Sequence, residues 1–369
     1  MLDLSPCCGR FAAGRTDSLN IVTHHQYPFE QILAEYGLRL AELSPLGNGL
    51  INQTWRVDVP QSGRYVLQRV NDVFSPAVNG DIDLLTRHLE AGGESTCRLV
   101  PTQDGDLWVA NAAGNWRLLT WVDGISHDSF KNPQQAVSAG MLLARFHQSV
   151  DGLEHEFATQ RPGVHDTLKH LAFLRETLDE RTEHPQYAVI EPLGRRILLA
   201  ADALPQLPHT RDRVVHGDPK INNILFRRNA DEAVCLVDLD TITRMPLPLE
   251  LGDAMRSWCN PASEDNSYGE FSTALFQHAM AGYAEVARDW IEEYEWRSIV
   301  DATQTILVEL AARFCADALN EAYFGWNPEQ FGSRSEHNQV RAAGQLTVAE
   351  SLVAQQPHLE TILHSAFEG

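Results

Sequence analysis

Four polar side chains of this sequence have the types and the spacing that phosphoryl transfer requires. Asp218 and Lys220 lie in one short segment, and Asn223 and Asp238 follow it. An aspartate can accept the proton of a substrate hydroxyl group, and a lysine close to it can contact the transferred phosphate. An asparagine and a second aspartate suit Mg²⁺, which needs only a few oxygen ligands from a protein. We therefore predict that Asp218 and Lys220 are catalytic and that Asn223 and Asp238 hold the metal.

Short apolar runs around these residues predict the strands that position them. The expected strands are residues 213–215, 224–226 and 234–237. The last two form a hairpin, because the polar residues 229–232 between them suit a turn. A loop held on strand ends can bring Asp218, Asn223 and Asp238 around one point, although they are distant in the sequence.

The first third of the chain has the pattern of a small sheet with helices. Helices are predicted at residues 29–38 and 81–89, and strands at residues 41–46, 52–59, 65–70, 107–110 and 116–121. A glycine turn with Gly47 and Gly49 lies between the first two strands, and Asn52 follows it. Glycines let backbone N–H groups approach a phosphate closely, so we assign these three residues to nucleotide binding.

The rest of the chain is mostly helical from about residue 132. Asn132 and Pro133 suit a helix start. Helical periodicity recurs at residues 273–286, 295–319 and 340–354. We therefore predict an extension, a small lobe and a helical lobe, at residues 1–28, 29–121 and 122–369.

These segments resemble the aminoglycoside phosphotransferase family, the small-molecule branch of the protein-kinase-like fold. They are most similar to its N-acetylhexosamine 1-kinase group, which has a similar Asp-x-Lys-x-Asn-Asn loop and a metal strand ending in Asp-Leu-Asp-Thr, here residues 238–241. The resemblance extends from about residue 29 to about residue 350. It implies an α+β fold of two lobes, with a five-stranded antiparallel sheet plus a helix in the N-lobe and a larger, mainly helical C-lobe.

The resemblance also implies ATP and Mg²⁺ as cofactors and gives roles to further residues. Asp253 is expected to support the catalytic loop through backbone hydrogen bonds. Kinase-like proteins usually carry lysine where this chain has Gln68, whereas Arg69 is the better electrostatic partner for a phosphate. These two side chains point to opposite faces of their strand, so the sequence leaves the choice between them open. Leu50 departs from the histidine that the group often carries in the glycine turn.

Four residues are candidates for binding the acceptor. In the hexosamine kinases an Arg, a Tyr and a Trp line the sugar pocket, and Arg313, Tyr323 and Trp326 match them if one residue is deleted between Arg and Tyr. His165 matches a similar His-Asp-Thr segment. From the residues alone, aromatic core packing and a helical pair between Glu309 and Arg313 explain this pattern equally well.

Composition and charge exclude several kinds of partner. The 369 residues are 43% hydrophobic. The formal net charge is −21 and no basic cluster is longer than two or three residues, so nucleic acid and anionic membranes are poor partners. No apolar run approaches a membrane span, and residues 1–20 lack the apolar core of a secretory signal. Six cysteines without regular spacing suit reduced thiols. We expect a cytoplasmic monomer or homodimer that binds ATP and a small-molecule acceptor.

The function predicted from these residues is a small-molecule kinase that transfers the γ-phosphate of ATP to a hydroxyl group. The acceptor that the resemblance favours is a hexosamine or N-acetylhexosamine at its anomeric hydroxyl. Homoserine, choline or an aminoglycoside are alternative acceptors. A nucleotide-binding pseudokinase regulator is a further alternative, which Gln68 favours and Asp218, Asn223 and Asp238 oppose. The same metal-ligand set argues against a binding protein that does not use ATP.

Overall fold

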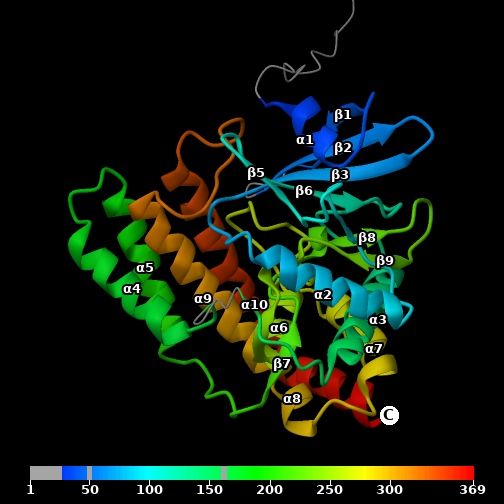
Figure 1. The fold of residues 1–369 in the computed structure, drawn as a ribbon. Coiled ribbons are helices and arrows are strands. Elements are labelled where there is room, and N and C mark those ends of the chain that lie inside the picture. The colour runs from blue at the N-terminus through cyan, green and yellow to red at the C-terminus, as the bar shows by residue number, and fades with distance from the viewer. Residues whose placement is uncertain (1–26, 48–51, 159–163) are drawn as a thin grey trace, which may run out of the picture.

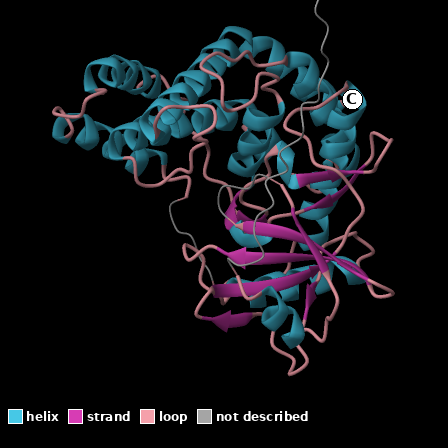
Figure 2. Cartoon of the chain, turned by 90° about the horizontal axis from the view of Figure 1, so that it is seen from above, coloured by secondary structure: helices cyan, strands magenta, loops and turns pink. Residues whose placement is uncertain are grey.

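An antiparallel sheet lies toward one end of the molecule, and most of the helices lie toward the other. The computed structural model describes residues 27–47, 52–158 and 164–369, and Figures 1 and 2 show this separation. The strand order is β1-β2-β3-β6-β4, and β5 pairs with β6. These strands are β1 (Glu42–Pro45), β2 (Gln53–Val59), β3 (Gly63–Val70), β4 (Leu99–Val100), β5 (Val109–Asn111) and β6 (Gly114–Thr120). The predicted turn residues Gly49 and Leu50 lie outside the described part of the chain.

The two faces of this sheet pack against different helices. Side chains alternate along a strand, and Trp55, Leu67 and Leu118 lie on the face that α1 (Phe29–Glu35) covers in one buried cluster. Gln68 and Arg117 are register partners on β3 and β6 and lie on the opposite face. Helix α2 (Val78–Ala91) packs on that second side, which turns toward the helical part of the molecule.

Helices make up most of the remaining chain. They are α3 (Pro133–Val150), α4 (Thr167–Glu180), α5 (Tyr187–Ala201), α6 (Leu247–Trp258), α7 (Thr273–Ala287), α8 (Glu293–Arg297), α9 (Ile299–Asn320) and α10 (Arg334–Glu368). Helix α9 is apolar and buried around nearly its whole circumference, as expected for a helix surrounded by others. It contacts α4, α5, α6 and α10, so it is the central helix of the large lobe.

Short strands and turns connect the sheet side to the helical side. β7 (Asp212–Val215) pairs with β10 (Thr243–Pro246), and β8 (Ile224–Phe226) pairs with β9 (Ala233–Leu236), both antiparallel. Two 3₁₀ turns follow β7 and β9, namely η1 (Ile221–Asn223) and η2 (Leu239–Thr241). The predicted strand, turn and hairpin around the polar motif are therefore present.

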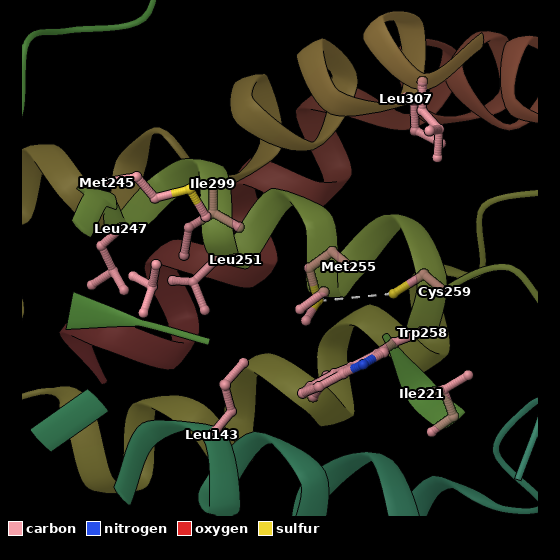
Figure 3. Packing of buried hydrophobic residues seen from close by; sticks show 14 of the residues in the cluster. Leu143, Ile221, Met245, Leu247, Leu251, Met255, Trp258, Cys259, Ile299 and Leu307 are labelled. Atoms are coloured by element: carbon pink, nitrogen blue, oxygen red, sulfur yellow. Dashed lines mark hydrogen bonds between the residues drawn. The ribbon is translucent and has the colours of Figure 1, made fainter. Parts of the chain in front are cut away.

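Helix α6 packs closely on α9, and its other side faces the apolar core that α3 also borders. Its side chains Leu251, Met255 and Trp258 are almost fully buried, and Figure 3 shows them packed in the core between these neighbours. Gly252 permits the close approach, because a Cβ there would lie 2.9 Å from the carbonyl oxygen of Ala302 on α9. Such dense packing gives little freedom to the polar residues that the same helix presents to the catalytic loop.

The structure confirms an α+β fold with an antiparallel sheet in the small lobe and a helical large lobe. The sheet has six strands rather than the predicted five, because the two-residue strand β4 is too short to produce a recognisable pattern. The helix expected at residues 295–319 is divided at Ser298 into α8 and α9. In the part of the chain that the structure describes, no helix is long and apolar enough to cross a membrane. The division into three regions stays a prediction.

Candidate active site

Asp218, Lys220 and Asn223 lie within hydrogen-bonding distance of one another between β7 and β8. Lys220 Nζ is 2.5 Å from Oδ2 of Asp218, and Asn223 Nδ2 donates to the carbonyl oxygen of Asp218 at 2.9 Å. Burial alone would raise the pKa of Asp218, but Lys220, with help from Arg256 and His216, holds that pKa below its usual value. Burial lowers the pKa of Lys220, yet the charge of Asp218 raises it overall. Asp218 is therefore an ionised carboxylate that can act as a base.

Helix α6 fixes the backbone of this catalytic loop. The carboxylate of Glu250 accepts the backbone N–H groups of His216 and Gly217, both at 3.0 Å. Trp258 Nε1 donates to the carbonyl oxygen of Pro219 at 2.8 Å. Glu250 is completely buried, so these hydrogen bonds are shielded from water. The loop is thus attached to a helix that is itself packed on two sides.

The expectation that Asp253 supports the catalytic loop is wrong. Asp253 Oδ1 accepts a hydrogen bond from Arg256 Nε at 2.7 Å, and the loop backbone is held by Glu250, about one helical turn earlier. The sequence does contain a signal for Glu250. It is the single acidic residue in the apolar start of α6, and a buried carboxylate requires hydrogen-bond partners.

A glycine allows the catalytic loop to touch the η2 turn. Gly217 has φ +81°, and a Cβ there would lie 2.2 Å from the carbonyl oxygen of Thr241. Thr241 Oγ1 donates to the carbonyl oxygen of His216 at 3.0 Å, and His216 Nε2 lies 2.9 Å from the carbonyl oxygen of Val237. The loop and the turn therefore form one hydrogen-bonded unit.

Asn223 and Asp238 are brought together by the hydrogen bonds between the paired strands β8 and β9. The N–H of Val237 donates to the carbonyl oxygen of Asn223 at 2.9 Å. Asp238 has φ +65°, a conformation that a residue with a side chain rarely adopts and that often marks a functional position. Burial and the neighbouring charge of Asp240 raise the pKa of Asp238 to about 7, although Lys220 opposes the shift.

These surroundings fit a divalent cation. A cation would offset the repulsion between the neighbouring carboxylates, and the amide oxygen of Asn223 would add a neutral ligand. Within residues 27–47, 52–158 and 164–369 no group of three or more His, Cys, Asp or Glu side chains is arranged to hold a metal. The arrangement instead suits an ion that takes few protein ligands and completes its shell with water and phosphate oxygens.

A buried arginine pairs with Asp240, two residues after Asp238. Arg117 Nη1 and Nη2 donate to the two carboxylate oxygens of Asp240 at 2.5 and 2.8 Å, and Arg117 Nε and Nη2 donate to Oε1 of Gln68 at 2.9 and 2.7 Å. Asn52 Nδ2 donates to Asp240 at 2.7 Å, while its Oδ1 accepts the backbone N–H of Asn71 at 2.9 Å. Gln68 and Asn52 therefore both lie in a hydrogen-bonded network centred on Asp240.

Arg69 lies on the other face of the sheet. Its Nε donates to the carbonyl oxygen of Ala113 at 2.7 Å, and its guanidinium lies 5.9 Å from the centre of the Tyr27 ring. Arg117 is not among the residues predicted from the sequence, although one feature of the sequence points to it. Arg117 is the only charged residue of β6, a strand in which Trp116 and other neighbours are buried.

Two of the acceptor candidates meet at one buried carboxylate on α9. His165 Nδ1 lies 3.0 Å from Oε1 of Glu309, and Arg313 Nη1 lies 3.7 Å from the same oxygen. Thr167 Oγ1 donates to Oε2 of Glu309 at 2.7 Å. The guanidinium of Arg313 lies 5.6 Å from the centre of the Phe324 ring. Burial alone would lower the pKa of His165, but the hydrogen bond and charge of Glu309 raise it overall.

The other two candidates lie in the segment after α9. Tyr323 is 58% exposed, and Trp326 is half-buried. Asp317 fixes the start of this segment, because its carboxylate accepts the N–H groups of Ala322, Tyr323 and Phe324 at 2.8 to 2.9 Å. Phe324, rather than Tyr323, is thus the ring over which the arginine of α9 lies.

The fold and the polar loop that carries Asp218, Lys220 and Asn223 together define a protein-kinase-like phosphotransferase. A family model described as "Phosphotransferase enzyme family" matches residues 42–294, and the chain therefore belongs to this family. It is therefore an ATP-dependent phosphotransferase that acts on an alcohol group of a small molecule.

Solved structures agree on the fold. An aminoglycoside phosphotransferase from Alicyclobacillus acidocaldarius has a TM-score of 0.58 at 16% identity, over 89% of this chain and 96% of that one. A microcompartment-associated aminopropanol kinase has a TM-score of 0.58 at 13% identity, over 89% and 97%. An amicoumacin kinase, solved with AMP-PNP and Ca²⁺, has a TM-score of 0.57 at 13% identity, over 92% and 94%. At such low identity these likenesses establish the fold alone.

Proposed function

We propose that Asp218, Lys220, Asn223 and Asp238 transfer phosphate from ATP to the anomeric hydroxyl of a hexosamine or N-acetylhexosamine. Asp218 orients this hydroxyl and accepts its proton, and Lys220 stabilises charge on the transferred phosphoryl group. The observation that carries the assignment is the ionised Asp218–Lys220 pair, with its 2.5 Å contact, on a loop that Glu250 holds rigidly.

Asn223 and Asp238 would hold Mg²⁺. The metal would neutralise charge on the phosphates and orient them. The backbone of the turn that starts at Gly47 would cover the nucleotide phosphates, with Gly49 and Asn52 as further contributors. Arg69 is a weaker candidate for a phosphate contact than the sequence suggested, because its guanidinium lies on the α1 side of the sheet.

The acidic side chains around the acceptor region support a neutral acceptor, which an N-acetylhexosamine is and a free hexosamine with its ammonium group is not. Glu309 is paired with His165 and Arg313, and Glu264 accepts a hydrogen bond from Arg256 Nη1 at 2.6 Å. A cationic acceptor such as choline would need carboxylates that are not already neutralised by arginine or histidine.

The next acidic residue along the chain is also paired. Asp265 accepts hydrogen bonds from Arg341 Nε at 2.7 Å and His337 Nε2 at 2.8 Å. Arg341 Nη1 in turn donates to the carbonyl oxygen of Gly325 at 2.9 Å, so these pairs hold the segment that carries Trp326. In this proposal His165, Arg313, Tyr323 and Trp326 supply hydrogen bonds and a ring surface for the sugar.

A screen of acceptors tests the proposal. ATP consumption with Mg²⁺ is measured against hexosamines, N-acetylhexosamines, homoserine, choline and an aminoglycoside, and NMR then locates the phosphate on the product. We expect phosphorylation of the sugars at the anomeric oxygen. Turnover on choline or an aminoglycoside, with none on the sugars, would contradict the acceptor assignment and leave the kinase assignment intact.

Substitution of Asp218, the proposed catalytic base, is a second test of the proposed function. Asp218→Ala should abolish transfer and keep the binding of Mg·ADP, because the nucleotide contacts lie on other residues. Asp202→Ala removes a largely exposed carboxylate on the outer surface and should behave as the wild type. Unchanged turnover of Asp218→Ala would exclude Asp218 as the base.

A further inference from the structure

Arg117 has an acceptor for every N–H group of its guanidinium. A guanidinium carries five such donors in a fixed planar arrangement. Two of them point to Oε1 of Gln68 and two to the carboxylate of Asp240. The fifth, on Nη1, points to Oδ1 of Asn79 at 3.4 Å. Because all five donors are used, a phosphate could contact Arg117 only by displacing a protein acceptor.

These contacts join four separate elements. Arg117 lies on β6, Gln68 on β3, Asn79 on α2 and Asp240 on η2. Arg117 is 2% exposed and Asp240 is equally buried. A fully buried, bidentate arginine–carboxylate pair has one well-defined geometry, so it fixes the relative positions of the groups it joins.

The pair also determines the charge next to the metal position. Asp240 is buried and Asp238 is half-buried, and the two carboxylates lie two residues apart at one turn. Without a cation at Asp240, two uncompensated carboxylates would repel each other there, and the turn would gain freedom to move them apart. Arg117 neutralises Asp240 and leaves Asp238 as the carboxylate available to a metal ion.

We propose that Arg117 is a positioning residue, which locks Asp240 and thereby holds Asp238 in its left-handed conformation for the metal. The proposal rests on the proposed function. In protein kinases a lysine on the third strand and a glutamate on the helix of the small lobe provide the charged connection at this place. Here Gln68 and Asn79 are neutral, and the cation comes from the neighbouring strand.

A residue that positions the metal ligand and a residue that binds phosphate affect ADP binding differently in the presence and absence of Mg²⁺. ADP is titrated calorimetrically into wild type and Arg117→Met, once with Mg²⁺ and once with EDTA. We expect the gain in ADP affinity that Mg²⁺ confers to fall about 10- to 100-fold in the variant, as is usual when a partner of a metal ligand is removed. The affinity for ADP in EDTA should stay that of the wild type. For Arg117→Lys this gain should lie between those of the wild type and Arg117→Met, because lysine keeps the positive charge but cannot form the bidentate hydrogen bonds of a guanidinium.

Arg213→Met is the matched control. Arg213 is also buried and also forms a bidentate pair, with Glu295 at 2.8 and 2.7 Å, in the large lobe. Its loss should lower the melting temperature and leave the Mg²⁺-dependent gain unchanged. A fall of ADP affinity in EDTA equal to that in Mg²⁺ would make Arg117 a phosphate ligand and overturn the proposal. If Arg117→Met leaves the Mg²⁺-dependent gain in ADP affinity unchanged, Arg117 is a core residue only, and this result would also overturn the proposal.

A double substitution keeps the test valid if Arg117→Met folds poorly. Arg117→Met together with Asp240→Asn removes both charges, so it should melt at a higher temperature than either single variant. The gain in ADP affinity from Mg²⁺ should still be reduced in this double variant, because the bidentate arginine–carboxylate pair that fixes the η2 turn is missing. Full recovery of that gain would show that Arg117 acts by charge alone and contradict a positioning role. Wild-type protein that binds no Mg·ADP would instead contradict the proposed function.

Discussion

Lys220 Nζ lies 2.5 Å from Oδ2 of Asp218, so the two side chains assigned to catalysis form an ion pair with each other. Asn223 Nδ2 lies 3.3 Å from the same oxygen. Oδ2 is therefore already engaged, and Oδ1 is the oxygen that can receive the proton of an acceptor hydroxyl. The pair also explains why Asp218 stays ionised in a site whose burial favours the protonated form.

Replacement of Lys220 should change both the rate and its pH dependence. Lys220→Met removes the positive charge that would stabilise the transferred phosphoryl group, and we expect turnover to fall about 10²- to 10³-fold. Lys220 lowers the pKa of Asp218, so its removal raises that pKa. The variant should then lose activity at a higher pH than the wild type as the medium is acidified, which a pH profile of kcat/KM measures. Lys169→Met, an exposed lysine on α4, is the control. If kcat/KM of the wild type and of Lys220→Met falls at the same acidic pH, Lys220 does not set the pKa of Asp218.

The contact between Gly217 and Thr241 can be tested with a matched pair of substitutions. Gly217→Ala places a Cβ 2.2 Å from a carbonyl oxygen, whereas Gly152→Ala has nothing within 4 Å, and the two glycines have φ of +81° and +79°. Both variants pay the cost of a left-handed alanine, about 1–2 kcal/mol. Gly217→Ala should lose about 1–3 kcal/mol more in the free energy of unfolding, because the loop and the turn must separate.

Activity distinguishes this loop strain from a general loss of stability. Gly217→Ala should also lower kcat, since the clash moves the catalytic loop away from the η2 turn. Gly152→Ala should keep the wild-type kcat at a temperature where it is folded. Chemical denaturation and steady-state kinetics measure the two effects, and equal stability of the two variants would argue against the close contact.

The catalytic loop could be predicted from the sequence because its information is local. Asp218, Lys220 and Asn223 lie within six residues of one another, between short apolar strands whose pattern is visible in the chain. The separation of Gln68 from Arg69 followed from the alternation of strand side chains alone, and the structure places them on opposite faces as expected.

The partners of these residues could not be predicted, because they depend on tertiary contacts. Arg117 and Asp240 are 123 positions apart, and Glu250 lies 34 positions from His216, whose backbone it holds. A sequence shows that such buried charges need partners, but it does not show which ones they meet. The family resemblance assigns the loop-supporting role to Asp253, whereas Glu250 on the same helix has it.

The pairing of His165 with Glu309 predicts a specific change of stability with pH. Burial alone would lower the pKa of His165, and the hydrogen bond and charge of Glu309 raise it overall above its usual value of 6.5. A folded-state pKa that is raised means that the folded protein binds this proton more tightly than the unfolded chain. The stabilisation is therefore fully present below the unfolded pKa and is lost as the pH rises through the folded pKa. His165→Gln keeps a hydrogen-bond donor that does not titrate.

Thermal unfolding of wild type and His165→Gln from about pH 5.5 to pH 8.5 measures this effect. The melting temperature of the wild type relative to the variant should be highest at the acidic end and should decrease as the pH rises above 6.5. His358→Gln replaces an exposed histidine on α10 and should show no such trend. A difference between wild type and His165→Gln that is constant with pH would mean that His165 stays neutral beside Glu309. Its contact with Glu309 would then be an ordinary hydrogen bond, and the imidazole could offer an acceptor sugar only a neutral partner.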